Sequence, residues 1–181
     1  FMARLSSSEE GDKVLNKLAA SVLAKLLYTA REARFDLLRA THKLLVNLHR
    51  WNADCDRRLY RLMCYINSTL EYRMVGWVGT LEKRPKDDLH LYTDADFAGC
   101  ARTQRSTTGV HLEIAGDFTK FPISAVSKRQ SAVSVSTPEA EGAAGHHGIT
   151  YELIPETYVA EIILRKDFGC FFHEDNTALV C

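Results

Sequence analysis

Acidic side chains occur at three places where the sequence predicts that a strand or a helix begins or ends. Asp94 lies near the end of one predicted strand, Glu141 in the first turns of a predicted helix, and Asp175 directly after another predicted strand. Functional sites are commonly built at such ends. Carboxylate oxygens are good ligands for Mg²⁺, and two such ions can activate water to cleave a phosphodiester. Spacing alone leaves a second interpretation open, namely three solvated surface acids.

The strand that carries the first acid is predicted from alternation of apolar and polar residues over 89–97. Because successive side chains of a strand point to opposite faces, Asp94 and Asp96 are expected on one face. Turn residues then separate a second predicted strand, 106–114, from a third, 120–127. Three successive antiparallel strands are therefore expected.

The second and third acids depend on elements further along the chain. Thr137 and Pro138 predict a helix start, since threonine is a good N-cap and proline is favoured in the first turn. We expect Pro155 to separate this helix from another over 156–166. The short apolar stretch 170–172 predicts a fourth, buried strand immediately before the third acid.

The first half of the chain has the periodicity of helices. Apolar residues recur at spacings of three and four in three stretches, 14–27, 37–51 and 55–66. Asn52 or Asp54 is the expected N-cap of the last of these. The charged, proline-containing segment 83–88 has no such periodicity and is the best candidate for a connector. We therefore predict a helical segment over 1–80 and a second domain over 81–181.

Composition restricts the partners and the location that can be inferred. The formal net charge is zero, so contacts with nucleic acid would depend on local basic clusters such as Lys128 and Arg129. Five cysteines without a C-x-x-C pair match neither a disulfide framework nor a zinc module, which favours a reducing intracellular location, cytoplasmic or nuclear. Because the sequence has no secretory leader pattern and no long uninterrupted apolar segment, no membrane role is expected.

Six short motifs occur in a fixed order in the second half: YTDADFAG (92–99), RSTTG (105–109), PIS (122–124), SKRQ (127–130), STPEAE (136–141) and DN (175–176). With them, residues 89–180 resemble the ribonuclease H (RNase H) domain of copia-type retrotransposon polyproteins. More weakly, residues 26–70 resemble the end of the reverse transcriptase and its connection into RNase H. Residues 1–25 match no family pattern.

The resemblance implies a fold, a reaction and a set of ligands. The fold would be α+β or α/β, with an RNase H-like mixed sheet of three antiparallel strands and a fourth strand. The reaction would be hydrolysis of the RNA strand of an RNA–DNA hybrid with two Mg²⁺ ions. Asp94, Glu141 and Asp175 would be the catalytic metal ligands. Glu139 is the alternative to Glu141, because residues two apart on a helix point in different directions, and Asp96 would act behind the ligands or face solvent.

The sequence also departs from the family pattern. The family's domain continues through a further helix and strand to a late histidine and a fourth aspartate, whereas this sequence stops at Cys181. The resemblance therefore implies an incomplete, C-terminally truncated domain whose partners would include other parts of the polyprotein. No polymerase motif with paired aspartates precedes residue 80. The alternative function is a non-catalytic remnant that binds a protein or a nucleic acid.

Overall fold

The computed structural model describes residues 9–80 and 87–177, and it describes side chains from residue 18 onward. These residues form two compact units that divide between Met74 and Val75. The division falls before the predicted boundary at residue 80 because Trp77 already belongs to the second unit, where its backbone exchanges two hydrogen bonds with Lys120. Most of the predicted connector lies outside the described residues.

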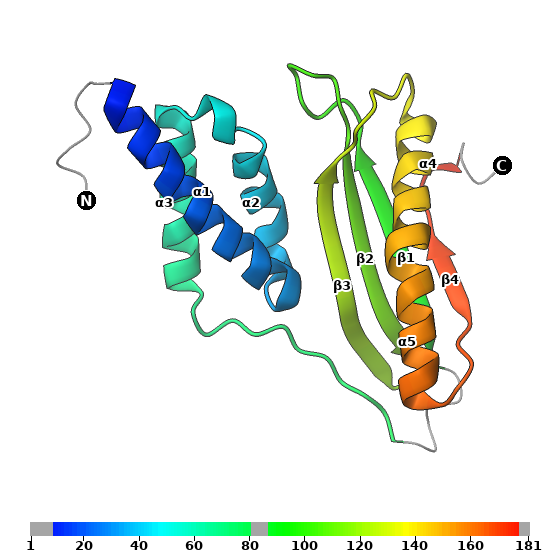
Figure 1. Ribbon diagram of the computed structural model, residues 1–181. Coiled ribbons are helices and arrows are strands. Elements are labelled where there is room, and N and C mark those ends of the chain that lie inside the picture. The colour runs from blue at the N-terminus through cyan, green and yellow to red at the C-terminus, as the bar shows by residue number, and fades with distance from the viewer. Residues whose placement is uncertain (1–8, 81–86, 178–181) are drawn as a thin grey trace. The chain divides into compact units, whose positions relative to one another are not determined.

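The first unit is helical, as the periodicity predicts (Figure 1). Its elements are α1 (Glu9–Glu32), the short 3₁₀ helix η1 (Phe35–Leu37), α2 (Leu38–Leu45), the 3₁₀ helix η2 (Leu48–Arg50) and α3 (Ala53–Ser68). Asn52 is the N-cap of α3, since its side-chain oxygen accepts hydrogen bonds from the backbone N–H groups of Asp54 and Cys55. Leu23 and Leu37 are among its most deeply buried side chains.

The second unit contains a four-stranded mixed sheet with the order β3-β2-β1-β4. The strands are β1 (Asp88–Asp96), β2 (Thr107–Gly116), β3 (Thr119–Arg129) and β4 (Cys170–His173). The first three strands are antiparallel neighbours, whereas β4 runs parallel to β1. The predicted α+β class with a mixed sheet is thereby confirmed.

One face of the sheet is covered by a long helical segment. It consists of α4 (Thr137–Gly148), the π-helical turn η4 (Ile149–Leu153) and α5 (Ile154–Leu164), which follow one another without a break (Figure 1). The expected separation at Pro155 is wrong. Proline lacks an N–H and its ring clashes with the preceding turn of a regular helix, but here it lies in the first turn of α5, directly after the wider π turn. The N-cap of α4 is Ser136 rather than Thr137.

The core of this unit lies between β1, β2 and the helical segment. Leu89, Leu91, Val110, Leu112 and Leu153 form one buried cluster, and three alanines, Ala95, Ala140 and Ala144, form another. At Gly148 a Cβ atom would lie 2.9 Å from the side chain of Thr93, so this glycine lets α4 approach β1 closely. Small residues on both elements therefore set the distance between the helix and the sheet.

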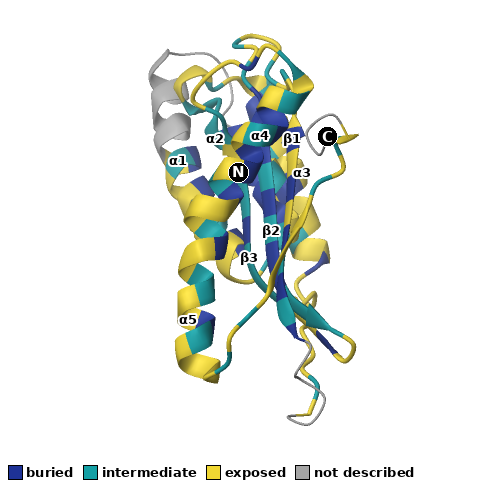
Figure 2. Cartoon of the chain, turned by 90° about the vertical axis from the view of Figure 1, so that its right-hand side faces the viewer, coloured by how far each residue is buried: buried dark blue, intermediate teal, exposed yellow. Residues whose placement is uncertain are grey.

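Two features are more exposed than the sequence suggests. The fourth strand was predicted to be buried, which is wrong: β4 is the last strand of the sheet that the described residues form, and all four of its residues are exposed. The second is α5, where only Ala160 is buried, as the exposed colouring of this helix in Figure 2 shows. Among the described residues, no helix combines the length and the apolar composition needed to cross a membrane.

Candidate functional site

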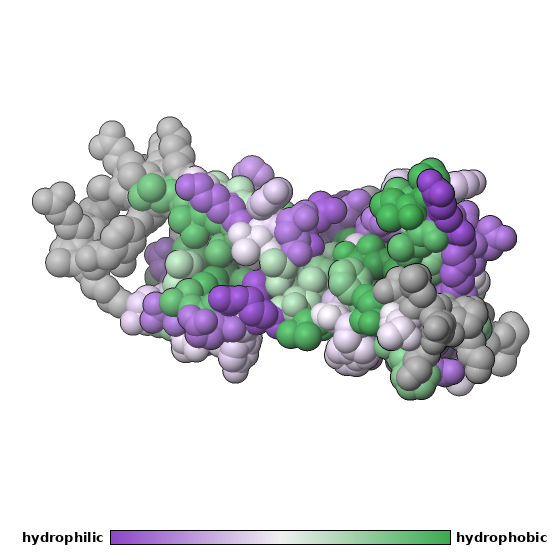
Figure 3. Space-filling view, turned by 90° about the horizontal axis from the view of Figure 1, so that it is seen from below, coloured by the Kyte–Doolittle hydropathy of each residue, from purple (hydrophilic) through white to green (hydrophobic). Residues whose placement is uncertain are grey.

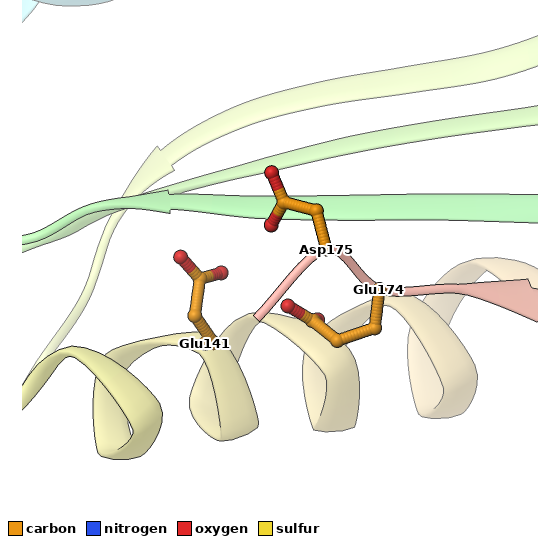
Figure 4. Close-up of side chains that lie close together, drawn as sticks. All are labelled: Glu141, Glu174 and Asp175. Atoms are coloured by element: carbon orange, nitrogen blue, oxygen red, sulfur yellow. The ribbon is translucent and has the colours of Figure 1, made fainter. Parts of the chain in front are cut away.

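Three carboxylates converge between the first turns of α4 and the segment that follows β4. One oxygen from each of Glu141, Glu174 and Asp175 lies within 4.8 Å of the others. Figure 4 shows Glu141 rising from the helix toward the two acids that follow the strand. The structure therefore brings together two of the three predicted ligands, Glu141 and Asp175, and adds Glu174, which sequence reasoning missed.

Pairing between β4 and β1 positions the two acids that follow β4. In the parallel register, Leu91 lies beside Phe172 and Tyr92 beside His173. The His173 ring stacks on Tyr92 with centroids 4.3 Å apart, and its Nε2 atom lies 2.9 Å from Nδ1 of His90. The residues after His173 consequently pass the end of β1 where α4 begins.

The carboxylate of Glu174 is held by two hydrogen bonds. The Thr93 hydroxyl donates to its Oε2 atom at 3.3 Å, and the backbone N–H of Asn176 donates to its Oε1 atom at 3.1 Å. Thr93 is buried on the face of β1 that packs against α4, so this contact draws Glu174 toward the helix. Adjacency to Asp175 was the only signal for Glu174 in the sequence, because the cross-strand contact depends on register.

Glu141 has the most unusual environment of the three acids. Its residue is only 4% exposed, and its Oε2 atom is buried without a hydrogen-bond partner. Burial, followed by the negative charges of Glu174, Asp94 and Asp175, raises the pKa of Glu141 to about 7. Burial and like charges both disfavour the ionised form. The side chain thus has an open acceptor in a strongly negative region.

Asp94 lies near this group but does not belong to it. Its charge contributes to the raised pKa of Glu141, yet it is not one of the three acids whose oxygens lie within 4.8 Å of one another. Strand alternation gives the reason: Thr93 and Ala95 are buried toward α4, whereas Asp94 is exposed and alternates with them. The predicted triad is therefore only partly assembled.

The structure distinguishes the two glutamates of the STPEAE motif. Glu139 accepts a hydrogen bond from the backbone N–H of Val135 at 2.7 Å, while its own N–H donates to the Ser136 hydroxyl. These reciprocal contacts resemble a capping box at the start of α4, with the N–H of Val135 in place of that of the N-cap Ser136. Glu139 is exposed and caps the helix, whereas Glu141 is buried and faces the carboxylate group.

The carboxylate of Asp96 lies against the turn residue Gly99.

The arrangement suits a divalent cation. No lysine, arginine or histidine of the described residues forms an ion pair with Glu141, Glu174 or Asp175. Like charges at this distance repel unless they are protonated or share a cation. Three carboxylates with one unpartnered buried oxygen offer the hard donor set that Mg²⁺ and Mn²⁺ prefer.

Basic residues lie at the same end of the sheet. Lys128 and Arg129 end β3, and the adjacent Gln130 side chain donates a hydrogen bond to the carbonyl of Ala140, the neighbour of Glu141. Lys128 also lies close enough to His147 of α4 to lower its pKa, after the larger effect of burial. Lys128 thus lies near the last turn of α4, and Gln130 contacts its first turns. Basic groups at the end of β3 can contact phosphates.

The fold and the site together define an α+β unit with a mixed four-stranded sheet and a carboxylate group at the end of β1 and β4. Comparison of the chain with protein-family models, with curated proteins and with solved structures gives no match in any of the three. The family assignment suggested by the motifs therefore continues as a proposal.

Proposed function

We propose that this chain is an RNase H-like nuclease that hydrolyses the RNA strand of RNA–DNA hybrids with the help of Mg²⁺. The observation that carries the proposal is the buried, unpartnered oxygen of Glu141 beside Asp175. The strand order β3-β2-β1-β4 and the six ordered motifs support the same conclusion. A deeply buried acid among other acids, with no cation paired to it, is the arrangement expected of a metal site.

Asp94, Glu141 and Asp175 would hold the ion, which is the ligand set that the motif resemblance implies. When bound, Mg²⁺ would polarise the scissile phosphate and lower the pKa of a coordinated water. Glu141, whose pKa of about 7 lies in the physiological range, would release its proton to solvent when it holds an ion. Lys128 and Arg129 would orient the hybrid through its phosphates, and the 2'-hydroxyl would distinguish RNA from DNA.

Cleavage of a labelled hybrid tests this function. Hybrid, duplex DNA and single-stranded RNA are incubated with the 181-residue chain and Mg²⁺, and the products are separated by length. We expect cleavage of the RNA strand in the hybrid only. Asp175→Asn and Asp94→Asn should each lower the rate by roughly 100-fold.

Glu156→Gln is the matched control for this assay. Glu156 is an acid of α5 outside the carboxylate group, so its replacement should leave the rate unchanged. Cleavage that Asp175→Asn does not affect, or that continues after chelation of the metal, would contradict the proposal.

A second candidate function is a non-catalytic module that binds a partner protein. It is favoured by the exposed apolar side chains of α5, where Tyr158, Ile162 and Ile163 are 65%, 77% and 70% exposed. The view in Figure 3 likewise shows apolar residues at the surface beside hydrophilic ones. Failure of the hybrid assay, together with no response of the chain to Mn²⁺, would favour this alternative.

A further inference from the structure

We infer that His90 and His173 form a second metal site, for a transition-metal ion such as Zn²⁺, that links strand β4 to strand β1. Nδ1 of His90 lies 2.9 Å from Nε2 of His173, although the two residues are 83 positions apart in the chain. Imidazole nitrogen is a preferred ligand of Zn²⁺, Ni²⁺ and Cu²⁺, whereas Mg²⁺ prefers oxygen. The site therefore differs in chemistry from the carboxylate group and does not depend on the proposed nuclease function.

The distance between the two nitrogens is close to that found around one ion. A tetrahedral Zn²⁺ ion with nitrogen ligands at about 2.0–2.1 Å holds two of them roughly 3.3 Å apart. Because the two atoms now lie 2.9 Å apart, a small rotation of each ring is enough to point both lone pairs at one ion. Each neutral imidazole then carries its proton on its other ring nitrogen.

Stacking across the two strands orients both rings in advance. The parallel register places each histidine beside an aromatic residue of the other strand. The His90 ring stacks on Phe171 with centroids 5.0 Å apart. The His173 ring stacks on Tyr92 with centroids 4.3 Å apart. Ligands whose orientation is already restricted lose less freedom when an ion binds, which increases affinity.

The histidine pair lies on the face of the sheet opposite the helical segment. Along β1, His90 alternates with leucines that are buried in the core beneath that segment. Glu174, the residue after His173, instead turns toward the helical side, where Thr93 donates a hydrogen bond to it. His90 is partly exposed and His173 is exposed, so an ion can reach the pair from solvent.

The pair supplies two ligands, and water would supply the others. Glu113, opposite His90 in β2, has one oxygen 3.5 Å from Nε2 of His111 and the other 3.8 Å from Nζ of Lys120. Over the part of the chain that the structure describes, no further histidine, cysteine or acid lies within 4.8 Å of both ligand nitrogens. We therefore expect a site of moderate affinity.

An ion held by both histidines would connect β4 more firmly to the sheet. This strand has four residues, all of them exposed, and its neighbour in the sheet is β1. An ion that binds only the folded arrangement stabilises that arrangement by mass action. Zn²⁺ should therefore raise the midpoint of thermal unfolding of the sheet unit.

Titration with Zn²⁺ tests the inference without any nucleic acid. The full 181-residue chain and its variants are titrated with ZnCl₂ near neutral pH, and binding is followed by calorimetry. We expect the wild-type chain to bind Zn²⁺ below millimolar concentration, and His90→Gln and His173→Gln each to weaken this binding by roughly 10-fold or more. His49→Gln, which replaces an exposed histidine of the helical unit, is the matched control and should leave the affinity unchanged.

Asp175→Asn separates the histidine pair from the carboxylate group. This variant removes an acid of that group, so the binding that depends on His90 and His173 should persist in it. Loss of all Zn²⁺ binding in Asp175→Asn would place the ion at the carboxylates and overturn the inference. Unchanged affinity in both His90→Gln and His173→Gln would overturn it as well.

Ring ¹⁵N NMR of the wild-type chain is a second measurement that does not depend on whether a variant folds, which circular dichroism would reveal. Zn²⁺ should shift the Nδ1 signal of His90 and the Nε2 signal of His173 but not the signals of His49. Unshifted His90 and His173 signals would contradict the inference. Zn²⁺ binding by the pair in a chain that leaves the hybrid uncut would contradict the nuclease proposal alone.

Discussion

Arg34 in the helical unit and Glu141 in the sheet unit are two ionisable side chains with opposite surroundings. In the helical unit, Arg34 donates two hydrogen bonds to Asp36 and two more to the carbonyl and hydroxyl oxygens of Thr69. In the sheet unit, Glu141 has an oxygen with no partner and three acids nearby. The Arg34 charge is thus neutralised within the fold, whereas Glu141 keeps an oxygen that could bind a cation.

The pKa values express the same difference. The hydrogen bonds from Arg34 are the main reason that the pKa of Asp36 is lowered, so this acid is more stable as an ion in the folded chain. Burial and neighbouring acids raise the pKa of Glu141. A partnered charge contributes to stability, whereas an unpartnered one reduces it. The presence of an ion pair at Asp36 and its absence at Glu141 therefore distinguish a structural contact from a candidate site.

The largest predicted effect is on the pH dependence of the sheet unit. Between the ordinary glutamate pKa near 4.5 and about 7, the folded chain binds a proton at Glu141 that the unfolded chain has released. The free energy of unfolding should therefore fall as pH rises through this window, by on the order of 3 kcal/mol. Urea denaturation from pH 5 to 8, followed by Trp77 fluorescence in a Trp51→Phe background, measures this fall.

Glu141→Gln isolates that contribution and should make the sheet unit more stable at pH 8. The variant is needed because burial lowers the pKa values of His90 and His147, so these two groups change stability with pH in the opposite direction. Over the same range the helical unit should change little, since Asp36 protonates only below its ordinary pKa of 3.8. A Glu141→Gln variant that is less stable at pH 8 would show that the native carboxylate has a counter-charge.

The second largest predicted effect is the loss of stability of the helical unit when Arg34 is replaced. Arg34→Met keeps much of the apolar side chain but removes all four hydrogen bonds that Arg34 donates, so Asp36 keeps the Tyr65 hydroxyl as a donor. It should destabilise the helical unit by roughly 2 kcal/mol. Arg34→Lys should fall between, because lysine cannot make the paired contact with Asp36. Trp51 fluorescence in a Trp77→Phe background reports this unit. No loss of stability in Arg34→Met would remove the contrast between the two units.

Addition of Mg²⁺ should have a smaller effect that is confined to the sheet unit. At ten times its dissociation constant, an ion that binds only the folded state stabilises it by about 1.4 kcal/mol. This stabilisation should be present at pH 8 and much reduced at pH 5, where Glu141 is protonated. Thermal unfolding with and without Mg²⁺ measures it, with Glu156→Gln as the positive control. Equal stabilisation of Glu141→Gln would place the ion elsewhere.

The smallest predicted effect separates the two glutamates of α4. Ser136→Ala removes the N-cap that accepts a hydrogen bond from Glu139, and it should cost about 1 kcal/mol of stability. Glu139→Gln should cost less, since glutamine still completes a capping box. Neither change should alter Mn²⁺ affinity. A loss of affinity in Glu139→Gln would make Glu139 part of the metal site after all.

The sequence predicted most of the elements because local periodicity reflects which face is buried. It identified β1 from alternation over 89–97, and it selected Glu141 over Glu139 through the motif resemblance. It could not show which acids have oxygens within 4.8 Å of one another, because that depends on contacts between α4, β1 and the segment after β4. Glu174 was missed for a related reason: its contacts depend on the parallel register of β4 and β1, which no local pattern specifies.

The errors in the helical segment also have a physical origin. Proline is read as a break because it removes a hydrogen bond from a regular α-helix. Here the π-helical turn directly before α5 widens the helix by one residue, and Pro155 lies just beyond it. Burial of β4 was overestimated because an apolar sequence such as CFFH gives no information on how many neighbours a strand has.

The π-helical turn at Ile149–Leu153 also determines which side of α5 faces the sheet. One extra residue in a helix rotates the following residues by about 100° around its axis. A chain that lost one residue between Ile149 and Leu153 would keep Glu141 at the carboxylate group, because α4 precedes the change. It would turn a different side of α5 toward the sheet, and the exposed Ile162 and Ile163 would move with it. Insertions and deletions of single residues in this turn are thus a simple route by which the outer surface of the unit can change while its carboxylate site stays the same.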